Sequence, residues 1–452
     1  MKNVSIFCLL FLIPNLILSE TSSYSYSSYS ATKTDESSTS GTITNSNSDE
    51  SAVYITKSGI TISDTAITKS GDSSNTENSE FYGVNAAILV NGGGLTMTGG
   101  SISTSGKGAN ALVATNGGTV TITGTEITST GSSSARGLHA TYGGTITATD
   151  VTISSTGGSC ATLATDRGEG TVSCSNCKLT TNGAGSPIIY STGTITITDT
   201  TGTSNAAQAV VVEGKNSATI KSSTLQCTAS PNNKNDECGV LIYQSQSVDA
   251  DTGTSTFTCE SSSIEILSTS SYYSSAPMFY VTNTAANIAL TDCEFTFGSG
   301  TFLNAATGSW GTSGSNGGTV TMTLTNQDIE GDIVVDSSSS LTLSLVNSSI
   351  KGKINTAKTA AKLAITLDSD STLTLTGNSY YTSLTNSDSS NSNIETGSYT
   401  WEKYDESSSA STTPTTTDDD DDIIPVNTSS SKHLNIYKQI VFSSFLILLV
   451  FL

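Results

Sequence analysis

Apolar residues recur through the middle of the chain at an interval far longer than one turn of an α-helix. Between residues 92 and 192 one pattern occurs four times, with extended runs such as Val120-Thr121-Ile122-Thr123. Strict alternation of apolar and polar residues is typical of a strand with one buried face, so Val120 and Ile122 should point inward. The first apolar residues of successive repeats stand 23 to 26 residues apart, at Leu95, Val120, Ile146, Val172 and Ile195.

Each repeat contains two further apolar anchors, separated by Gly, Ser and Asn. The second anchor follows the first by seven residues, at Ile102, Ile127, Ile153 and Leu179. The third is expected at Leu112, Leu138, Thr162 and Ile188. Glycine and β-branched residues dominate these runs, which disfavours helices, and glycine tolerates the backbone angles of tight corners. Because one coil cannot bury its apolar face alone, the sequence predicts an all-β solenoid with three short strands per turn.

The repeat resembles the pectin lyase-like family over residues 51–400, by its period and pattern rather than by a unique motif. The resemblance implies a right-handed parallel β-helix of about ten to twelve turns. That family includes polysaccharide lyases, glycosidases and non-catalytic adhesins. Further first runs are expected at residues 218–220, 256–259, 288–290, 320–322, 341–343 and 373–375.

The remaining segments predict a secreted protein. Residues 1–19 contain a lysine followed by an apolar run, as in a signal peptide. Residues 20–50 are rich in Ser, Thr and Tyr, and we expect a lead-in with little packed structure. The β-helix should occupy residues 51–406 and end in an aromatic cap around Trp401. Residues 407–431 are then a Ser/Thr/Pro-rich and acidic stalk.

Residues 432–452 have the layout of a glycosylphosphatidylinositol attachment signal. The last 13 residues are apolar, fewer than the ~20 that a membrane-spanning helix needs. A polar spacer and a group of small residues precede them. We expect the anchor at Ser429 or Ser430, with Asn427 possible, and removal of residues 432–452. A weak tail anchor is the alternative. The two processing signals together predict the outer leaflet of the plasma membrane, reached through the secretory pathway.

The charge balance excludes some partners. The chain has 39 acidic and 18 basic residues and a net charge of −21 at pH 7. Binding to nucleic acid requires Lys and Arg opposite the phosphates, so no nucleic-acid partner is expected. The sequence also indicates no cofactor.

Eight cysteines are present, and Cys8 would leave with the signal peptide. An odd number would then remain in a secreted chain, where disulfides are common. We predict one bridge between Cys227 and Cys238, which bracket a polar loop. Cys174 and Cys177 form a CxxC sequence without a second ligand pair for zinc. Cys174 and Cys259 occupy the inward position of Ile122 in the repeat, so we interpret them as buried small hydrophobes. A sequon at Asn347 predicts N-glycosylation.

One gathering of charged residues could support catalysis: Arg136, His139, Asp150, Asp166, Arg167 and Glu169. The enzymes of the resembled family carry clustered carboxylates beside Arg, Lys or His. A glycosidase needs two carboxylates at a fixed separation across the bond, and no such arrangement is evident here. We therefore expect solvated corner charges, with a polysaccharide lyase or glycoside hydrolase as the alternative function.

A second alternative comes from outward threonines. Thr-x-Thr pairs recur in the first runs at Thr96/Thr98, Thr121/Thr123, Thr147/Thr149 and Thr196/Thr198. Such an array looks like the ladders of ice-binding solenoids, although outward threonine also suits any solvent-facing strand. Ser173, Ser175, Lys221 and Cys259 are expected to interrupt it.

The favoured interpretation depends on insertions. Residues 72–80, 228–237 and 267–276 all fall between a second and a third run, so they should emerge along one edge of the rod. Aromatic side chains in or near these loops could stack on sugar rings: Tyr243, Tyr272, Tyr273, Tyr280 and Trp310. We expect a non-catalytic, lipid-anchored adhesin or coat component that binds an extracellular glycan or surface protein, with self-association possible.

Overall fold

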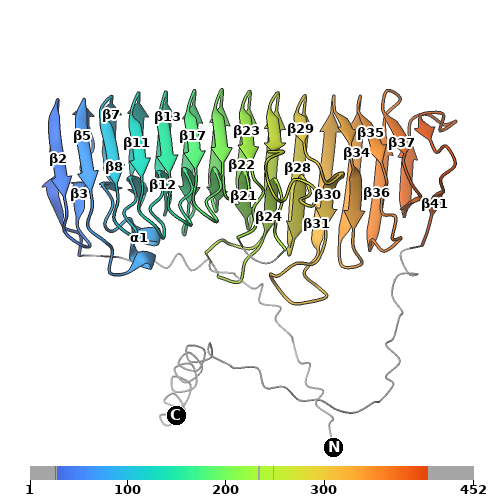
Figure 1. Ribbon diagram of the computed structural model, residues 1–452, viewed down its shortest axis with the longest axis horizontal. Coiled ribbons are helices and arrows are strands. Elements are labelled where there is room, and N and C mark those ends of the chain that lie inside the picture. Colours follow the sequence, from blue (N-terminus) through green and yellow to red (C-terminus); the bar gives the residue numbers. More distant parts are fainter. Residues whose placement is uncertain (1–25, 27, 233–234, 248, 406–452) are drawn as a thin grey trace, which may run out of the picture. The chain divides into compact units, whose positions relative to one another are not determined.

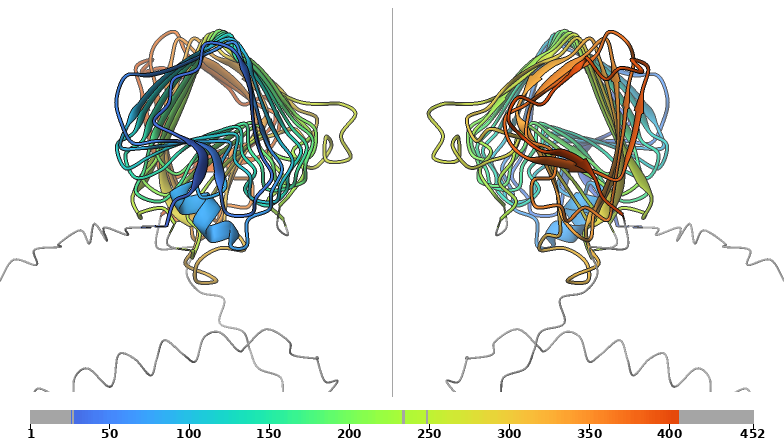
Figure 2. Two further views of the ribbon diagram at one scale, coloured as in Figure 1. Left: turned by 90° about the vertical axis from the view of Figure 1, so that its left-hand side faces the viewer. Right: turned by 90° about the vertical axis from the view of Figure 1, so that its right-hand side faces the viewer.

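The computed structural model describes residues 26, 28–232, 235–247 and 249–405, and these form a parallel β-helix (Figure 1). The predicted signal peptide, stalk and anchor signal lie outside the described residues. Most coils pass through three long parallel sheets, which give a three-sided cross-section when viewed along the axis (Figure 2). We call them sheets A, B and C.

Sheet A contains 12 strands and holds the third run of each repeat. Its strands are β1 (Ala31–Thr34), β3 (Ser51–Ile55), β6 (Ile88–Asn91), β9 (Leu112–Thr115), β12 (Leu138–Ala140), β15 (Leu163–Thr165), β18 (Ile189–Ser191), β21 (Val210–Glu213), β24 (Val240–Tyr243), β27 (Phe279–Thr282), β30 (Thr301–Ala305) and β33 (Asp332–Val335).

Sheet B contains 13 strands and holds the first runs. Its strands are β4 (Ile60–Ser63), β7 (Gly94–Thr98), β10 (Thr119–Thr123), β13 (Thr145–Thr149), β16 (Thr171–Ser175), β19 (Thr194–Thr198), β22 (Ser217–Lys221), β25 (Thr254–Glu260), β28 (Thr284–Thr291), β31 (Gly318–Thr325), β34 (Ser340–Val346), β36 (Lys362–Leu367) and β39 (Ser383–Asn386).

Sheet C contains ten strands and holds the second runs: β2 (Gly41–Asn45), β5 (Thr65–Lys69), β8 (Ser101–Thr104), β11 (Glu126–Ser129), β14 (Thr152–Ser155), β17 (Lys178–Thr181), β20 (Thr201–Ser204), β23 (Thr224–Cys227), β26 (Ser263–Ile266) and β29 (Glu294–Thr296). Two smaller sheets complete the later coils, one of β32 (Asp328–Glu330), β35 (Ser349–Gly352), β37 (Thr372–Leu375) and β40 (Ile394–Glu395), the other of β38 (Ser379–Tyr381) and β41 (Trp401–Lys403).

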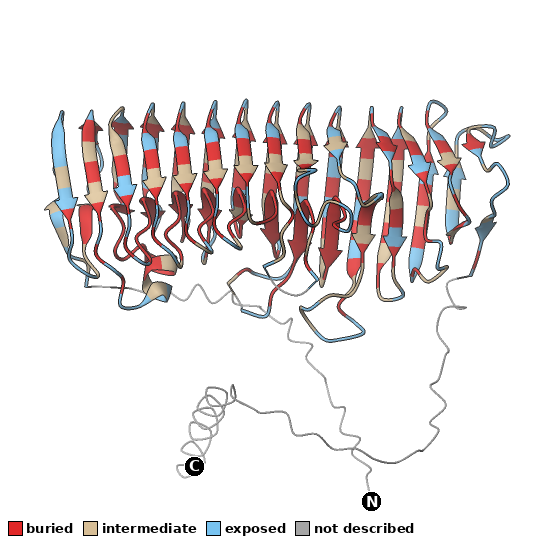
Figure 3. Ribbon diagram, in the orientation of Figure 1, coloured by how far each residue is buried: buried red, intermediate tan, exposed pale blue. Residues whose placement is uncertain are grey.

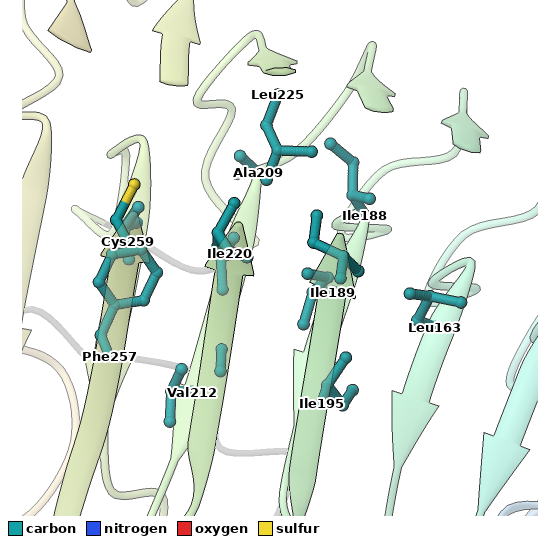
Figure 4. Packing of buried hydrophobic residues seen from close by; sticks show 14 of the residues in the cluster. Leu163, Ile188, Ile189, Ile195, Ala209, Val212, Ile220, Leu225, Phe257 and Cys259 are labelled. Carbon is teal, nitrogen blue, oxygen red and sulfur yellow. The ribbon is translucent and has the colours of Figure 1, made fainter. Parts of the chain in front are cut away.

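The predicted internal column is confirmed. Leu95, Val120, Ile146, Val172 and Ile195 pair in register on consecutive strands of sheet B, and all five are buried. Figure 3 shows buried residues alternating with exposed or intermediate ones along the strands of the solenoid. Ile195, Ile220 and Phe257 point into the same interior from successive coils (Figure 4). Stacking therefore supplies both the backbone hydrogen bonds and the apolar core.

The predicted third column is displaced by one residue in two coils. Leu138 pairs with Leu163, which pairs with Ile189, so Thr162 and Ile188 are not the strand anchors. Thr162 lies just before the strand, and its hydroxyl donates a hydrogen bond to the Ile188 carbonyl oxygen at 2.7 Å. Both corner residues are nevertheless buried, which is why the apolar pattern alone does not distinguish the two registers.

The β-helix begins earlier than predicted. Strands β1 and β2 lie in the expected lead-in, yet they pair in parallel with β3 and β5. Strand β1 has the sequence ATKT with no large apolar side chain, so its pattern gave no strand signal. At the other end, residues 373–375 belong to β37 in a smaller sheet rather than to sheet B, where the strand of that coil is β36. Sheet B itself has 13 strands, one more than the upper limit of ten to twelve expected turns.

The corner that follows most sheet B strands has one repeated backbone conformation. The first residue after the sheet B strand adopts a left-handed conformation in 11 consecutive coils: Asp64, Gly99, Gly124, Asp150, Asn176, Asp199, Ser222, Ser261, Asp292, Asn326 and Asn347. Gly, Asn and Asp tolerate this region best. The sequon residue Asn347 is exposed at this corner, and its side-chain amide donates to Asn326 at 2.9 Å.

The predicted Cys227–Cys238 bridge is wrong. The bonded pair is Cys174–Cys177, and both predicted partners are unbonded. Cys227 packs inside the solenoid, whereas Cys238 packs in a separate cluster with Tyr243 on the outside of sheet A. Burial raises the pKa of Cys227 to about 12, which suppresses its reactive thiolate.

A matched pair of substitutions tests the inward and outward faces. Ile146 is fully buried and Thr147 is exposed on the same strand. We expect Ile146→Ala to lower the free energy of unfolding by about 2–4 kcal/mol through the cavity it leaves. Thr147→Ser should change it by less than about 0.5 kcal/mol. Urea unfolding followed by circular dichroism measures both, and equal losses would contradict this assignment of faces.

Candidate functional site

The outward side chains of sheet A are mostly apolar and buried, whereas those of sheet B are mostly exposed or half-buried. One outward position per strand forms a column in register: Leu89, Val113, His139, Ala164, Tyr190, Val211, Leu241 and Tyr280. All of these side chains are buried except Tyr190, which is half-buried. Strands that are buried on both faces need a second covering layer.

That cover comes from loops at both edges of the sheet. Residues 70–87, 228–239 and 267–278 connect sheet C to sheet A, so the three predicted insertions do share one edge. Two further long connections, residues 244–253 and 306–317, leave the opposite edge toward sheet B. In Figures 1 and 2, helix α1 (Thr76–Tyr82) and several of the longer loops lie on the lower side of the solenoid.

Helix α1 is short and capped at both ends. The Asn75 side chain accepts a hydrogen bond from the Glu77 amide at 2.9 Å, and Gly83 ends the helix in a left-handed conformation. Phe81 and Tyr82 are buried on the solenoid side of this insertion. The helix therefore packs as part of the cover over sheet A.

The predicted catalytic cluster is partly assembled but buried, so the expectation of solvated corner charges is wrong for its central members. Arg136, His139 and Asp166 are buried, and the Arg136 guanidinium contacts Asp166 Oδ2 at 2.7 Å. A second carboxylate that the sequence analysis missed, Glu80 of α1, also forms an ion pair with Arg136. Arg136 therefore links the helix to two coils of sheet A.

His139 is held in its neutral form. Its Nε2 lies 2.7 Å from the Glu80 carbonyl oxygen, and its Nδ1 lies 3.2 Å from the Arg136 guanidinium. This geometry assigns the proton to Nε2, which donates to the carbonyl, and leaves Nδ1 as an acceptor. Burial and then the Arg136 charge hold the pKa of His139 well below its usual value. His139 thus fastens α1 rather than exchanging protons near neutral pH.

Asp166 has the opposite perturbation. Burial, followed by repulsion from Glu80, raises the pKa of Asp166 to about 7, although Arg136 opposes the shift. One guanidinium faces two carboxylates here, so it cannot fully compensate both charges in a desolvated site. Protonation of Asp166 near neutral pH relieves that imbalance.

The outer members of the cluster also tie loops to the solenoid. Arg167 bonds to Asp249 in the 244–253 loop at 2.7 Å, and its guanidinium carbon lies 3.7 Å from the centre of the Phe81 ring. Glu169 pairs with Lys215 at 2.7 Å. Arg167 thus touches the insertions from both edges of sheet A.

Asp150 does not belong to this site. It is exposed at the corner between sheets B and C, where it adopts the repeated left-handed conformation and accepts a hydrogen bond from Asn176. The other cluster members lie in or beside strands of sheet A. The sequence analysis grouped Asp150 with the others because they fall in adjacent coils. The three corners of a coil lie apart, however, and Asp150 is at a different corner.

Two adjoining cavities lie farther along sheet A and form a groove. Their volumes are about 180 Å³ and about 50 Å³, and they share lining residues Gly185, Pro187, Tyr190, Asn232 and Tyr243. Glu80 and Arg136 close one end, and Trp310 from the 306–317 loop lines the other. The Trp310 and Tyr243 rings have centroids 5.2 Å apart. We call this the sheet A groove.

The buried carboxylate of Glu213 holds two tyrosines that line the sheet A groove. Glu213 Oε2 accepts hydrogen bonds from the hydroxyls of Tyr190 and Tyr243, at 2.6 and 2.8 Å. Burial raises the pKa of both tyrosines well above the usual value, so both remain donors. Glu213 Oε1 and the Trp310 indole N–H are buried without a hydrogen-bond partner. Each therefore has bonding capacity left for a ligand or water.

The predicted aromatic residues separate into two sets. Tyr243, Tyr280 and Trp310 belong to the cluster on the outside of sheet A. Tyr272 and Tyr273 instead pack against the main core and do not line the groove. The sequence missed Tyr190 and Glu213, although apolar triplets such as Val210-Val211-Val212 carry the signal of a strand buried on both faces.

The predicted threonine ladder exists as a geometric feature of sheet B. Thr96, Thr121, Thr147, Ser173 and Thr196 pair in register on its outer face. Cys259 does not interrupt it, because that residue points inward and its half-buried neighbour Glu260 pairs with Lys221. Ice binding by this face stays a prediction.

Comparisons of the chain with protein-family models, curated protein sequences and solved structures found no match. The pectin lyase-like resemblance therefore stays a prediction, whereas the parallel β-helix is observed in the stacked sheets. Within the described part of the chain, no helix is long and apolar enough to cross a membrane.

The Asp166 site should make stability depend on pH. Its folded-state pKa of about 7 exceeds the ~3.9 of an unfolded aspartate, so its contribution is complete below pH ~4 and is lost as pH rises through 7. Between pH 5 and pH 8 the wild type should lose free energy of unfolding relative to Asp166→Asn, whose side chain does not titrate. Urea unfolding of both proteins at the two pH values gives the difference; parallel pH profiles would contradict it.

Proposed function

We propose that this protein is a non-catalytic, lipid-anchored surface adhesin that binds an extracellular glycan in the sheet A groove. The observation that carries the proposal is the juxtaposition of Tyr190, Tyr243 and Trp310 between loops from opposite edges of one rigid sheet. Sites on a rigid scaffold with variable loops are typical of binding proteins.

The chemistry of the groove suits a sugar. Aromatic rings offer flat apolar surface to the C–H faces of a pyranose, while Gln208 and Asn232 line the same cavities with hydrogen-bonding amides. The unpartnered indole N–H of Trp310 adds a donor. A glycan of several residues could extend along the groove, because both cavities open along the same row of coils.

The charges favour neutral or amino sugars over uronic acids. The charged residues that line the cavities are Glu80, Asp236 and Arg136, and Arg136 already forms ion pairs with two carboxylates. Glu213 lies directly beneath the tyrosine hydroxyls. An anionic polysaccharide would meet a negative surface, whereas a protonated amino sugar would be attracted.

The same contacts favour binding over catalysis. Glu80 and Asp166 share one arginine, and Asp166 is buried. A glycosidase needs two carboxylates that reach opposite sides of the scissile bond. A lyase would act on uronates, which the groove charge disfavours. Polysaccharide-active chemistry remains the competing proposal.

Trp310→Ala tests the groove. In a glycan array of neutral, amino and uronic acid sugars, we expect the wild type to bind neutral or amino glycans, and Trp310→Ala to weaken the best of them at least about tenfold, because an aromatic anchor is lost. Tyr399→Ala is the matched control, since Tyr399 is 43% exposed and does not line the groove. Undiminished binding by Trp310→Ala would contradict the site. New reducing ends or unsaturated uronides, lost in Asp166→Asn, would favour the enzyme.

The anchor has its own test. The small residues at 427–431, the spacer and the apolar tail support a lipid anchor at Ser429 or Ser430. On cells that express the full chain, phosphatidylinositol-specific phospholipase C should move the protein into the medium. A chain that lacks residues 432–452 should be secreted without enzyme. Full-length protein that stays in the detergent phase after treatment would indicate a tail anchor instead.

A further inference from the structure

Two cysteines in consecutive coils lie in direct contact. The sulfur atoms of Cys259 and Cys293 are 2.6 Å apart, although no bond joins them in the structure. Cys259 is in β25, and Cys293 is at the corner that follows β28, the neighbouring strand of sheet B. Two unbonded thiols do not normally approach so closely, and a disulfide bond needs only a further contraction of about 0.5 Å.

The pair occupies the same two internal columns as the bonded cysteines. On sheet B, Cys174 and Cys259 belong to one inward column, joined in register through Ile197 and Ile220. The corner after these strands holds a second column, made of Cys177, Thr200, Ser223 and Ser262. The backbone amide of each of the first three donates a hydrogen bond to the side chain of the next, at 3.2, 3.1 and 3.0 Å in that order. The Ser262 amide continues this series with a hydrogen bond to Cys293.

Each pair therefore places one sulfur in the strand column and one in the corner column. In Cys174–Cys177 both residues belong to the same coil. In the second pair, Cys293 contacts a cysteine of the preceding coil. Leu290 occupies the strand column in the coil of Cys293, and Ser262 occupies the corner column in the coil of Cys259, so neither coil holds both cysteines. The fold thus offers the same geometry once within a coil and once between coils.

We propose that Cys259 and Cys293 form a disulfide bond that cross-links two consecutive coils. The Cys293 thiolate attacks one sulfur of an oxidised glutathione and releases one glutathione thiolate. The Cys259 thiolate then attacks the Cys293 sulfur of the mixed disulfide and releases the second. Two protein thiols lose two protons and two electrons, and one glutathione disulfide is reduced to two thiols.

The surroundings assign the order of attack. Cys293 is 8% exposed and Cys259 is fully buried, so an oxidant reaches Cys293 first. The neighbouring Cys259 thiol and the Ser262 amide lower the pKa of Cys293, which favours its thiolate. The bond would close a loop that contains the 267–278 insertion and would fix the register of β25 on β28.

Peptide mapping tests the linkage directly. The full chain, folded with oxidised glutathione, is alkylated without reduction and digested after glutamate and after aromatic residues. Cleavage at Phe257, Glu260 and Tyr280 separates Cys259 from Cys293 and from Cys238. We expect a disulfide-linked pair of peptides that carry Cys259 and Cys293. Alkylation of both thiols, with no linked pair, would overturn the proposal.

Thermal unfolding with and without reductant provides an independent readout. Cys293→Ser should lower the Tm of the oxidised protein by about 5 °C, and reductant should lower the Tm of this variant less than that of the wild type. The double variant Cys259→Ser/Cys293→Ser should show the same reduced sensitivity to reductant. Cys160→Ser is the matched control, because Cys160 is another buried, unbonded thiol and should leave the wild-type sensitivity intact. Equal sensitivity in all four proteins would contradict the cross-link.

Discussion

The whole structure depends on the in-register parallel pairing of one coil with the next. A single coil has an apolar interior too thin to exclude water, and its backbone groups find partners only in neighbouring coils. The inward column from Leu95 to Ile195 pairs from coil to coil without a slip. A shift of one residue would turn every inward side chain outward, so stacking fixes the register as well as the stability.

Sheet A differs from the other two sheets because it is covered on both faces. Its outward column is apolar, and loops from both edges fold over it. Arg136 and Arg167 hold those loops through ion pairs and a ring contact. Where the cover is incomplete, Tyr190, Tyr243 and Trp310 line a groove. The groove proposed as the binding site is therefore a gap in a second hydrophobic layer rather than a feature of the solenoid itself.

Much of the fold could be predicted because the repeat is local in the sequence and regular in space. The period of the repeat predicted the strands of sheet B. The insertions all fall between a second and a third run, which predicted that they share one edge of the solenoid. The prediction failed where a strand has no large apolar residue, or where two adjacent residues are both buried. Strand β1 has no large apolar residue, and Thr162 and Leu163 are both buried, so the pattern could not choose between them.

The sequence by itself determined a parallel β-solenoid, its inward columns and its acidic charge, because these follow from spacing and composition. Only the tertiary structure decided which charged residues meet. Asp150 and Asp166 are close in sequence, but the corners of the coil separate them, while Glu80 reaches Arg136 across two coils. Side-chain partners depend on which corner each residue occupies and on the path of the long loops over the solenoid. The period of the repeat determines neither.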